Sequence, residues 1–163
     1  MDTATRLLGQ LIKHLVRFLG YVWSLPHTLF GVLLLLTVYF PKRVRWSEGA
    51  LDVVVRWHLI PKGMDKTGDG DLDDPEDFVT GGQTHGIIIF YADEYQAQRQ
   101  RLRCHERIHV LQCMIFGGLL YPLLYGLSSM AAAFSGDDYY RDNHFEVWAR
   151  AWEGGDVPWP LKD

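Results

Sequence analysis

The first part of the chain combines apolar and basic side chains with a helical period. Large apolar residues recur every three or four positions, at Leu7, Leu8, Leu11, Ile12, Leu15, Phe18 and Leu19. The basic residues Arg6, Lys13 and Arg17 fall outside this stripe. The pattern predicts an amphipathic helix over residues 4–23, which suits a membrane surface or a partner helix.

Strand-like patterns follow in the middle of the chain. β-Branched and aromatic residues on both sides of a turn-like segment, residues 47–49, predict a β-hairpin over residues 43–60. Residues 61–75 are dense in Gly, Asp and Pro and predict a loop. After two glycines, residues 84–91 predict a strand.

Two helices are predicted in the second half of the chain. Residues 92–112, at least, have a helical pattern. A last helix is expected to begin between Asp137 and Asn143 and to end near the glycines at positions 154 and 155.

Length and composition limit the classes of protein to which the chain can belong. Its 163 residues fit a single domain, residues 1–163, and a hydrophobic content of 48% allows a core to form. A formal net charge of -4, without a long Lys/Arg block, argues against nucleic acid as a partner. Cys104 and Cys113 would lie about 13 Å apart in one helix, which is too far for a disulfide.

Two long segments, residues 18–40 and residues 111–134, contain no Asp, Glu, Lys or Arg. Either is long enough to cross a bilayer, so membrane lipid is an expected partner; two core helices of a small soluble domain are the alternative. The basic cluster Lys42, Arg43 and Arg45 after the first segment is stronger than the basic residues before it. This difference favours the cytoplasmic side of the membrane for the part after that cluster.

The strongest chemical signal is the motif His105-Glu106-Arg107-Ile108-His109. In a helix, two histidines at i and i+4 lie one above the other and can reach one metal ion. A zinc ion held by two histidines and a carboxylate keeps one position for water, lowers the pKa of that water and polarises a substrate carbonyl. Glu106 is then the candidate general base. A charged, solvated helix face is the alternative for so short a motif.

Several residues after this helix are candidates for a third ligand: Asp137, Asp138, Asp142, His144, Glu146 and Glu153. Glu146 also fits a capping box, in which Asn143 is the N-cap and Glu146 reaches back to its backbone N–H. His144 and Glu146 point about 200° apart in a helix, so both cannot reach one ion. Cys113 is too far along the helix from His105 to share a tetrahedral ion and is expected to be a small buried apolar residue.

Two motifs together resemble known proteins. A Glu-x-x-Ala step at Glu146, after a His-Glu-x-x-His helix, is similar to the gluzincin metallopeptidases, in which that glutamate is the third zinc ligand. Residues 105–112 and 140–146 more closely resemble a group of small bacterial membrane proteins with the patterns H-E-R-x-H-x-x-Q and Y-R-D-N-x-F-E. The likeness extends over about residues 24–150. It implies a zinc ion held by His105, His109 and Glu146.

Other polar residues could complete such a site. His85 precedes an apolar strand and is a candidate extra ligand or oxyanion donor, or a strand-end histidine satisfied by the backbone. Tyr139, Tyr140 and Arg141 are candidate oxyanion stabilisers, with ordinary surface positions as the alternative.

A separate acidic segment, residues 65–76, matches a twelve-residue calcium loop. Its carboxylates at loop positions 1, 5, 7, 9 and 12 are Asp65, Asp69, Asp71, Asp73 and Glu76. Thr67 departs from the usual residue at position 3, and Pro61 and Gly63 leave no entering helix. A calcium site therefore competes with a solvated acidic turn.

These patterns and the resemblance predict an α+β, mostly helical protein. A zincin-like metal helix is expected to pack on a small antiparallel sheet within residues 41–163, after a hydrophobic helical membrane segment, residues 1–40. The expected function is a zinc metallopeptidase of a bacterial membrane that hydrolyses peptide or protein substrates. The alternative is a membrane scaffold with a structural or vestigial zinc site, which a fourth ligand such as His85 or His144 would favour.

Overall fold

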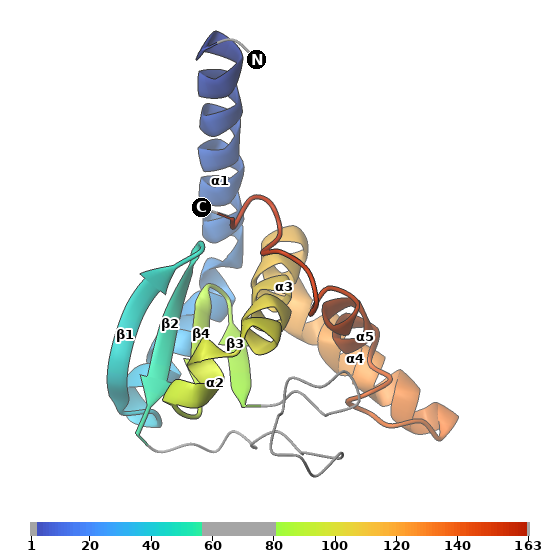
Figure 1. The fold of residues 1–163 in the computed structure, drawn as a ribbon. Helices are drawn as coiled ribbons and strands as arrows, with labels where there is room; N and C mark the ends of the chain where they lie inside the picture. Colours follow the sequence, from blue (N-terminus) through green and yellow to red (C-terminus); the bar gives the residue numbers. More distant parts are fainter. Residues whose placement is uncertain (1–2, 57–80, 163) are drawn as a thin grey trace.

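The computed structural model describes residues 3–56 and 81–162. A helix of 35 residues, α1 (Thr3–Thr37), opens the described part and continues well beyond the predicted amphipathic segment (Figure 1). The elements after it are β1 (Pro41–Ser47), β2 (Ala50–Val55), β3 (Gly82–His85), β4 (Ile88–Tyr91), α2 (Glu94–Gln98), α3 (Gln100–Phe116), α4 (Leu120–Ser135) and α5 (His144–Arg150). The expected α+β, mostly helical class is confirmed.

The sheet is mixed, where an antiparallel sheet was predicted. Its strand order is β1-β2-β4-β3, with antiparallel β1–β2 and β3–β4 pairs and a parallel β2–β4 pair. All four residues of β4 are buried, whereas β3 is polar and partly exposed. Strands buried on both faces read as continuous apolar runs, so the apolar β4 takes the inner place beside β2 and β3 takes the edge.

The predicted hairpin is confirmed for β1 and β2. Glu48 and Gly49 have φ values of 47° and 69°, as a two-residue turn of the primed type requires. The single strand predicted over residues 84–91 is wrong, because the chain reverses between β3 and β4. Gly86 makes this turn with a φ of 63°, and a Cβ there would overlap Thr28 Oγ1.

The predicted continuous helix over residues 92–112 is also interrupted. Arg99 has an extended backbone between α2 and α3, and Asp93 caps α2 by accepting a hydrogen bond from Gln96 N–H. The uncharged segment, residues 111–134, is divided between α3 and α4, whose axes bend by 115°. Gly117, with a φ of 89°, ends α3 beside Trp23 of α1.

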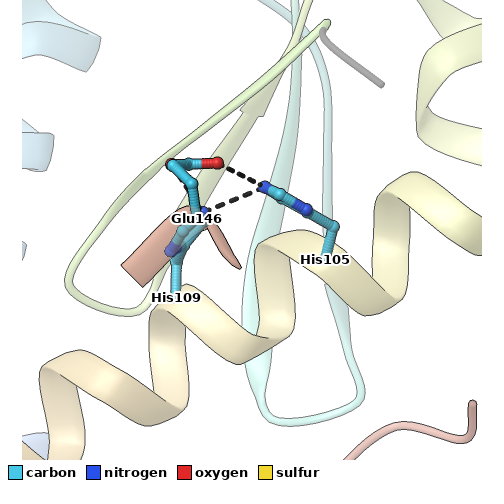
Figure 2. A group of neighbouring side chains, drawn as sticks. All are labelled: His105, His109 and Glu146. Atoms are coloured by element: carbon cyan, nitrogen blue, oxygen red, sulfur yellow. Dashed lines mark hydrogen bonds and ion pairs between the residues drawn. The ribbon is translucent and has the colours of Figure 1, made fainter. Parts of the chain in front are cut away.

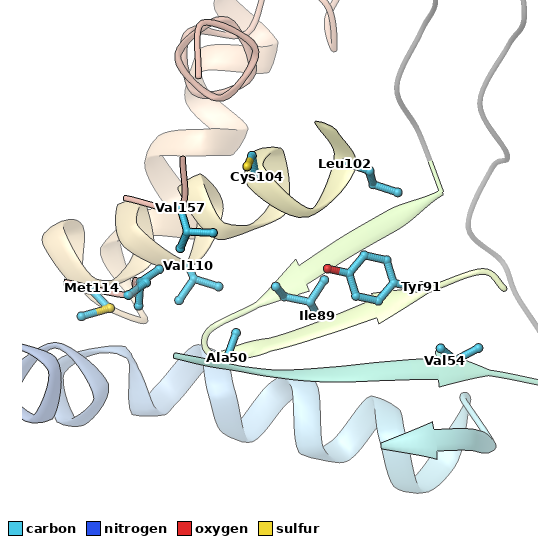
Figure 3. Close-up of a cluster of buried hydrophobic side chains, with 10 residues drawn as sticks. Ala50, Val54, Ile89, Tyr91, Leu102, Cys104, Val110, Met114 and Val157 are labelled. Carbon is cyan, nitrogen blue, oxygen red and sulfur yellow. The ribbon is translucent and has the colours of Figure 1, made fainter. Parts of the chain in front are cut away.

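The sheet lies between α1 and α3. On one face, α3 and the C-terminal segment cover residues that include Ala50, Ile89 and Tyr91 (Figure 3). On the other face, Leu34 and Leu35 of α1 pack against a second buried cluster, formed by Tyr39, Val53, Val55, Ile88, Phe90 and Ala92. Among the described helices, α1 is the one that by itself is long and apolar enough to cross a membrane.

Candidate metal centre

Helix α3 brings two histidines of the motif to one side. His105 and His109 lie one turn apart, and their rings project from α3 toward Glu146 (Figure 2). Only 2% of His105 and 6% of His109 are exposed. The neighbouring Leu102, Val110 and Met114 belong to the core between α3 and the sheet, which fixes the rotation of the helix about its axis.

Helix α5 supplies the carboxylate. Asn143 is its N-cap, as expected, and accepts a hydrogen bond from Phe145 N–H at 2.9 Å. The Asn143 side chain also donates to Tyr125 O and Ser129 Oγ of α4, which fixes the start of α5. The side chain of Glu146 points to the two histidines: Oε1 lies 3.2 Å from His109 Nε2 and Oε2 lies 3.2 Å from His105 Nε2.

The spacing of these donors suits one ion. His105 Nε2 and His109 Nε2 lie 3.0 Å apart. One ligand atom from each of His105, His109 and Glu146 lies within 4.8 Å of the other two. Two nitrogen or oxygen ligands bound at about 2.0–2.1 Å in tetrahedral geometry are about 3.3 Å apart. Glu146 Oε2 is buried and faces His105 Nε2 at 3.2 Å, so a proton or a bound cation is needed on that side of the oxygen.

The outer nitrogen of each ring is held by a fixed acceptor. His105 Nδ1 lies 2.8 Å from Glu153 Oε1, and His109 Nδ1 lies 2.8 Å from Gln112 Oε1. Because Gln112 Nε2 donates to Phe145 O, the Gln112 oxygen faces the ring. Carboxylate and amide oxygens only accept, so each neutral ring carries its hydrogen on Nδ1 and leaves Nε2 as a bare lone pair. Three acceptors that face one another in this way could hold a cation between them.

The preference for positive charge also appears in the pKa values. Burial opposes protonation of His105, but hydrogen bonds to Glu146 and Glu153 raise its pKa to about 10. Burial disfavours the Glu146 carboxylate, yet the charge of His109 and hydrogen bonds from both histidines hold its pKa well below the usual range. A proton and a metal ion therefore compete for the same place. The buried group of His105, His109 and Glu146 could hold a metal ion.

Comparisons of the chain with family models, with curated proteins and with solved structures find no significant match. The chemistry of the centre therefore follows from its own residues.

Glu106 stands beside this group and is not part of it. It is 4% exposed, and its Oε2 accepts a hydrogen bond of 2.6 Å from Thr84 Oγ1 of the edge strand β3. A Cβ on Gly82 would overlap Glu106 Oε1, so the absence of a side chain there makes room for the carboxylate. The candidate base is thus held between α3 and the sheet edge, one residue after the first histidine.

Two other predicted ligands lie elsewhere. His85 Nδ1 is 3.1 Å from His27 Nε2 of α1, and its Nε2 is buried without a hydrogen bond. His144 is exposed and its Nδ1 lies 3.2 Å from Ser128 Oγ. Glu153 is close to the centre, but it contacts the outer nitrogen of His105. Cys113 is fully buried, as expected for a small apolar residue.

Of the candidate oxyanion stabilisers, Tyr140 comes nearest to the centre. Burial, the charge of Glu146 and a hydrogen bond to Glu146 raise the pKa of Tyr140, so it remains a neutral donor. Tyr139 is 65% exposed, and Arg141 is exposed beside Asp138. The candidate calcium ligands lie outside the described residues: Asp65, Asp69, Asp71, Asp73 and Glu76.

Three residues that support the centre were not predicted from the sequence to do so. Gln112 follows His109 by three positions, and residues at this spacing are neighbours on a helix. This spacing is the feature of the sequence from which the contact could have been predicted. Tyr121 and Tyr125 lie one turn apart on α4; the hydroxyl of Tyr121 is 3.1 Å from His109 Nδ1, and that of Tyr125 donates to Glu146 Oε1 at 2.6 Å. Their contacts depend on the bend between α3 and α4, which the uncharged sequence conceals.

Proposed function

We propose that this chain is a membrane-associated zinc metallopeptidase. The observation that carries the proposal is the convergence of His105 Nε2, His109 Nε2 and the Glu146 carboxylate, with both Nδ1 atoms bound on their outer sides. Two histidines and one carboxylate form a donor set of catalytic zinc, which leaves a position for water. The resemblance to gluzincins, which use the same three residue types, supports this choice of metal.

Bound zinc would supply a Lewis acid that activates water and polarises the scissile carbonyl. Glu106 would take the proton from the attacking water and deliver it to the leaving amine, because it directly follows His105 in the chain. Thr84 holds one oxygen of that carboxylate and so fixes its orientation. Tyr140, which stays neutral, would donate its hydroxyl proton in a hydrogen bond to the developing oxyanion.

A peptide substrate fits the position of β3. This strand is at the edge of the described sheet and contacts Glu106 through Thr84. The exposed edge of a strand can pair with an extended peptide through backbone hydrogen bonds. Such pairing would bring a peptide bond past the carboxylate of the base, which favours peptide or protein substrates.

A second candidate function is that of a membrane scaffold with a structural metal ion. The burial of all three donors favours it, because His105, His109 and Glu146 are 2–6% exposed in the described part of the chain. Structural zinc sites are closed, whereas catalytic sites keep an open position. The two functions differ in what they require of Glu106: a base in the enzyme, and a neighbour without chemistry in the scaffold.

The test combines metal content with hydrolysis. The wild-type protein should purify with about one zinc per chain, and His109→Ala should lose most of it. Glu106→Gln should keep zinc and thermal stability while hydrolysis of a casein or peptide-library substrate falls by about 10²–10⁴-fold. His144→Ala is the matched control, because this exposed α5 histidine lies outside the donor group and should change neither quantity. Equal zinc content in wild type and His109→Ala would refute the proposed metal site. Full activity of Glu106→Gln would refute the proposed enzyme mechanism and favour the scaffold function.

A further inference from the structure

Helix α1 has one side of polar and small residues, which extends from residue 6 to residue 31. The residues of this side succeed one another at intervals of three or four: Arg6, Gln10, Lys13, Arg17, Gly20, Ser24, Thr28 and Gly31. The last four are buried against the rest of the protein. Arg17 donates to Pro160 O and Leu161 O, so this side of the earlier part also faces the body of the protein, by which we mean the described residues between 39 and 162.

The opposite side of α1 is apolar and exposed. Its largest contributors are spaced by three or four residues: Leu8, Leu11, Leu15, Phe18, Val22, Leu25, Leu29, Val32 and Leu36. Exposed apolar residues also flank this row at positions 12, 19, 23, 30 and 33. At 100° per residue the apolar side covers about half of the helix circumference, and at 1.5 Å per residue α1 extends over about 52 Å. We call this surface the apolar side of α1.

A bilayer-crossing orientation conflicts with these positions. The uncharged half of α1 is the half to which the body is attached, so a span there would place the sheet at the same depth. Arg43 and Arg45 of β1 are exposed on that sheet, and a charged side chain at the membrane centre is strongly unfavourable. The other half of α1 contains Lys13 at its middle. Neither half has a full apolar circumference.

A partner helix also fits the apolar side poorly. A two-stranded coiled coil buries a narrow seam and has charged residues beside it. Here the positions beside the row include Ile12, Leu19 and Leu33, which extend the apolar surface, and the exposed His14 at its other edge. The only Asp, Glu, Lys or Arg residues of α1 are Arg6, Lys13 and Arg17, all basic and all on the polar side. A broad apolar side with basic residues opposite is typical of helices that lie at an anionic membrane surface.

We propose that α1 lies parallel to the plane of an anionic bilayer, with its apolar side in the acyl-chain boundary and the body on the aqueous side. The apolar side would enter about 5–10 Å, as in other interfacial helices, and Trp23 suits this depth. Arg6 and Lys13 would reach the headgroups with their long side chains. This orientation rests on the membrane association proposed above and is independent of the metal chemistry.

The depth of α1 can be measured along its length. The full chain with Leu11→Cys, Val22→Cys or Leu33→Cys is labelled with an NBD fluorophore and bound to phosphatidylcholine/phosphatidylglycerol vesicles. The native cysteines are buried and should not react. Quenching by 5-doxyl lipid is compared with quenching by 12-doxyl lipid. Lys13→Cys on the polar side is the matched control, which aqueous iodide should quench.

An in-plane helix predicts that 5-doxyl lipid quenches all three labels more strongly than 12-doxyl lipid does. A helix that crosses the bilayer predicts a gradient, with stronger 12-doxyl quenching at one of the three positions, and would overturn the orientation. Labels that neither the doxyl lipids nor iodide quenches would refute the membrane orientation. They would indicate that a second copy of the chain covers the apolar side of α1. If the protein does not bind vesicles at all, membrane association fails as well, whereas zinc content and Glu106→Gln still test the enzyme separately.

Discussion

Arg107, the central residue of the histidine motif, should contribute strongly to stability. It is completely buried and joins α3 to the β1–β2 hairpin. Its guanidinium donates to Tyr91 Oη at 3.0 Å, to Ser47 O at 3.0 Å and to Asp52 Oδ2 at 2.9 Å, and Nε lies 2.9 Å from Glu48 Oε2. Burial raises the pKa of Asp52, and Arg107 opposes that shift. Asp52 therefore depends on this partner for its charge.

Arg107→Met should destabilise the protein by about 3–5 kcal/mol. The magnitude follows because the change leaves Asp52 without its buried partner, and breaking a buried pair on one side costs about this much. With an unfolding entropy of about 2.1 cal/mol/K per residue, 4 kcal/mol corresponds to a Tm lower by about 10 °C. Thermal unfolding in detergent, followed by circular dichroism against wild type, measures the shift.

Two comparisons make the reasoning refutable. Arg103→Met removes another arginine that binds Glu48, but the Arg103 side chain is 21% exposed, so its loss should cost at most about 1 kcal/mol. Arg107→Met combined with Asp52→Leu should recover much of the lost stability, because an apolar pair can replace a buried ion pair. If the Tm of Arg107→Met lies within about 2 °C of that of Arg103→Met, the contribution of the Arg107–Asp52 ion pair to stability is smaller than predicted.

Three further outcomes are expected. Glu153→Gln should weaken zinc binding about 10- to 100-fold in competition with a chromophoric chelator, because the carboxylate that orients His105 is lost; unchanged affinity would argue against this role. Burial and the neighbouring histidine lower the pKa of His85 to about 4, so unfolded chains bind a proton there between pH 6.5 and 4 and folded chains do not. Stability should therefore fall by about 3 kcal/mol as pH falls through this window, and His85→Phe should lose less over the same range; equal losses would count against this assignment. Gly82→Ala should displace the Glu106 carboxylate and reduce hydrolysis with zinc retained, and unchanged kcat would contradict the packing argument.

The centre was more predictable than the sheet because its residues follow from local spacing. His105 and His109 are one helical turn apart in any α-helix, and Asn143 marks the start of the helix that carries Glu146. The ring partners Gln112 and Glu153 could not be chosen from the sequence alone, since many polar residues lie near the motif. Their roles require the packing of segments that are distant in sequence.

Two of the differences between the predicted and the observed elements have a common origin in close backbone contacts. Gly86 and Gly117 end a strand and a helix where the chain meets α1, and each fits only without a side chain. An apolar sequence on both sides of such a glycine looks continuous. The predicted strand over residues 84–91 and the uncharged segment over residues 111–134 were therefore each divided at a glycine that packs against α1.

Through the same contacts, α1 also supports the candidate metal centre. Gly118 N–H donates to Trp23 O, so the bend between α3 and α4 is fixed on α1. The first turn of α4 then contains Tyr121, whose ring lies 5.8 Å from that of His27 and whose hydroxyl is 3.1 Å from His109 Nδ1. A shift of α1 against the body would thus move a hydrogen-bond partner of a metal-ligand candidate. Because the small residues of α1 allow this close packing, the helix serves the fold on one side and remains apolar and exposed on the other.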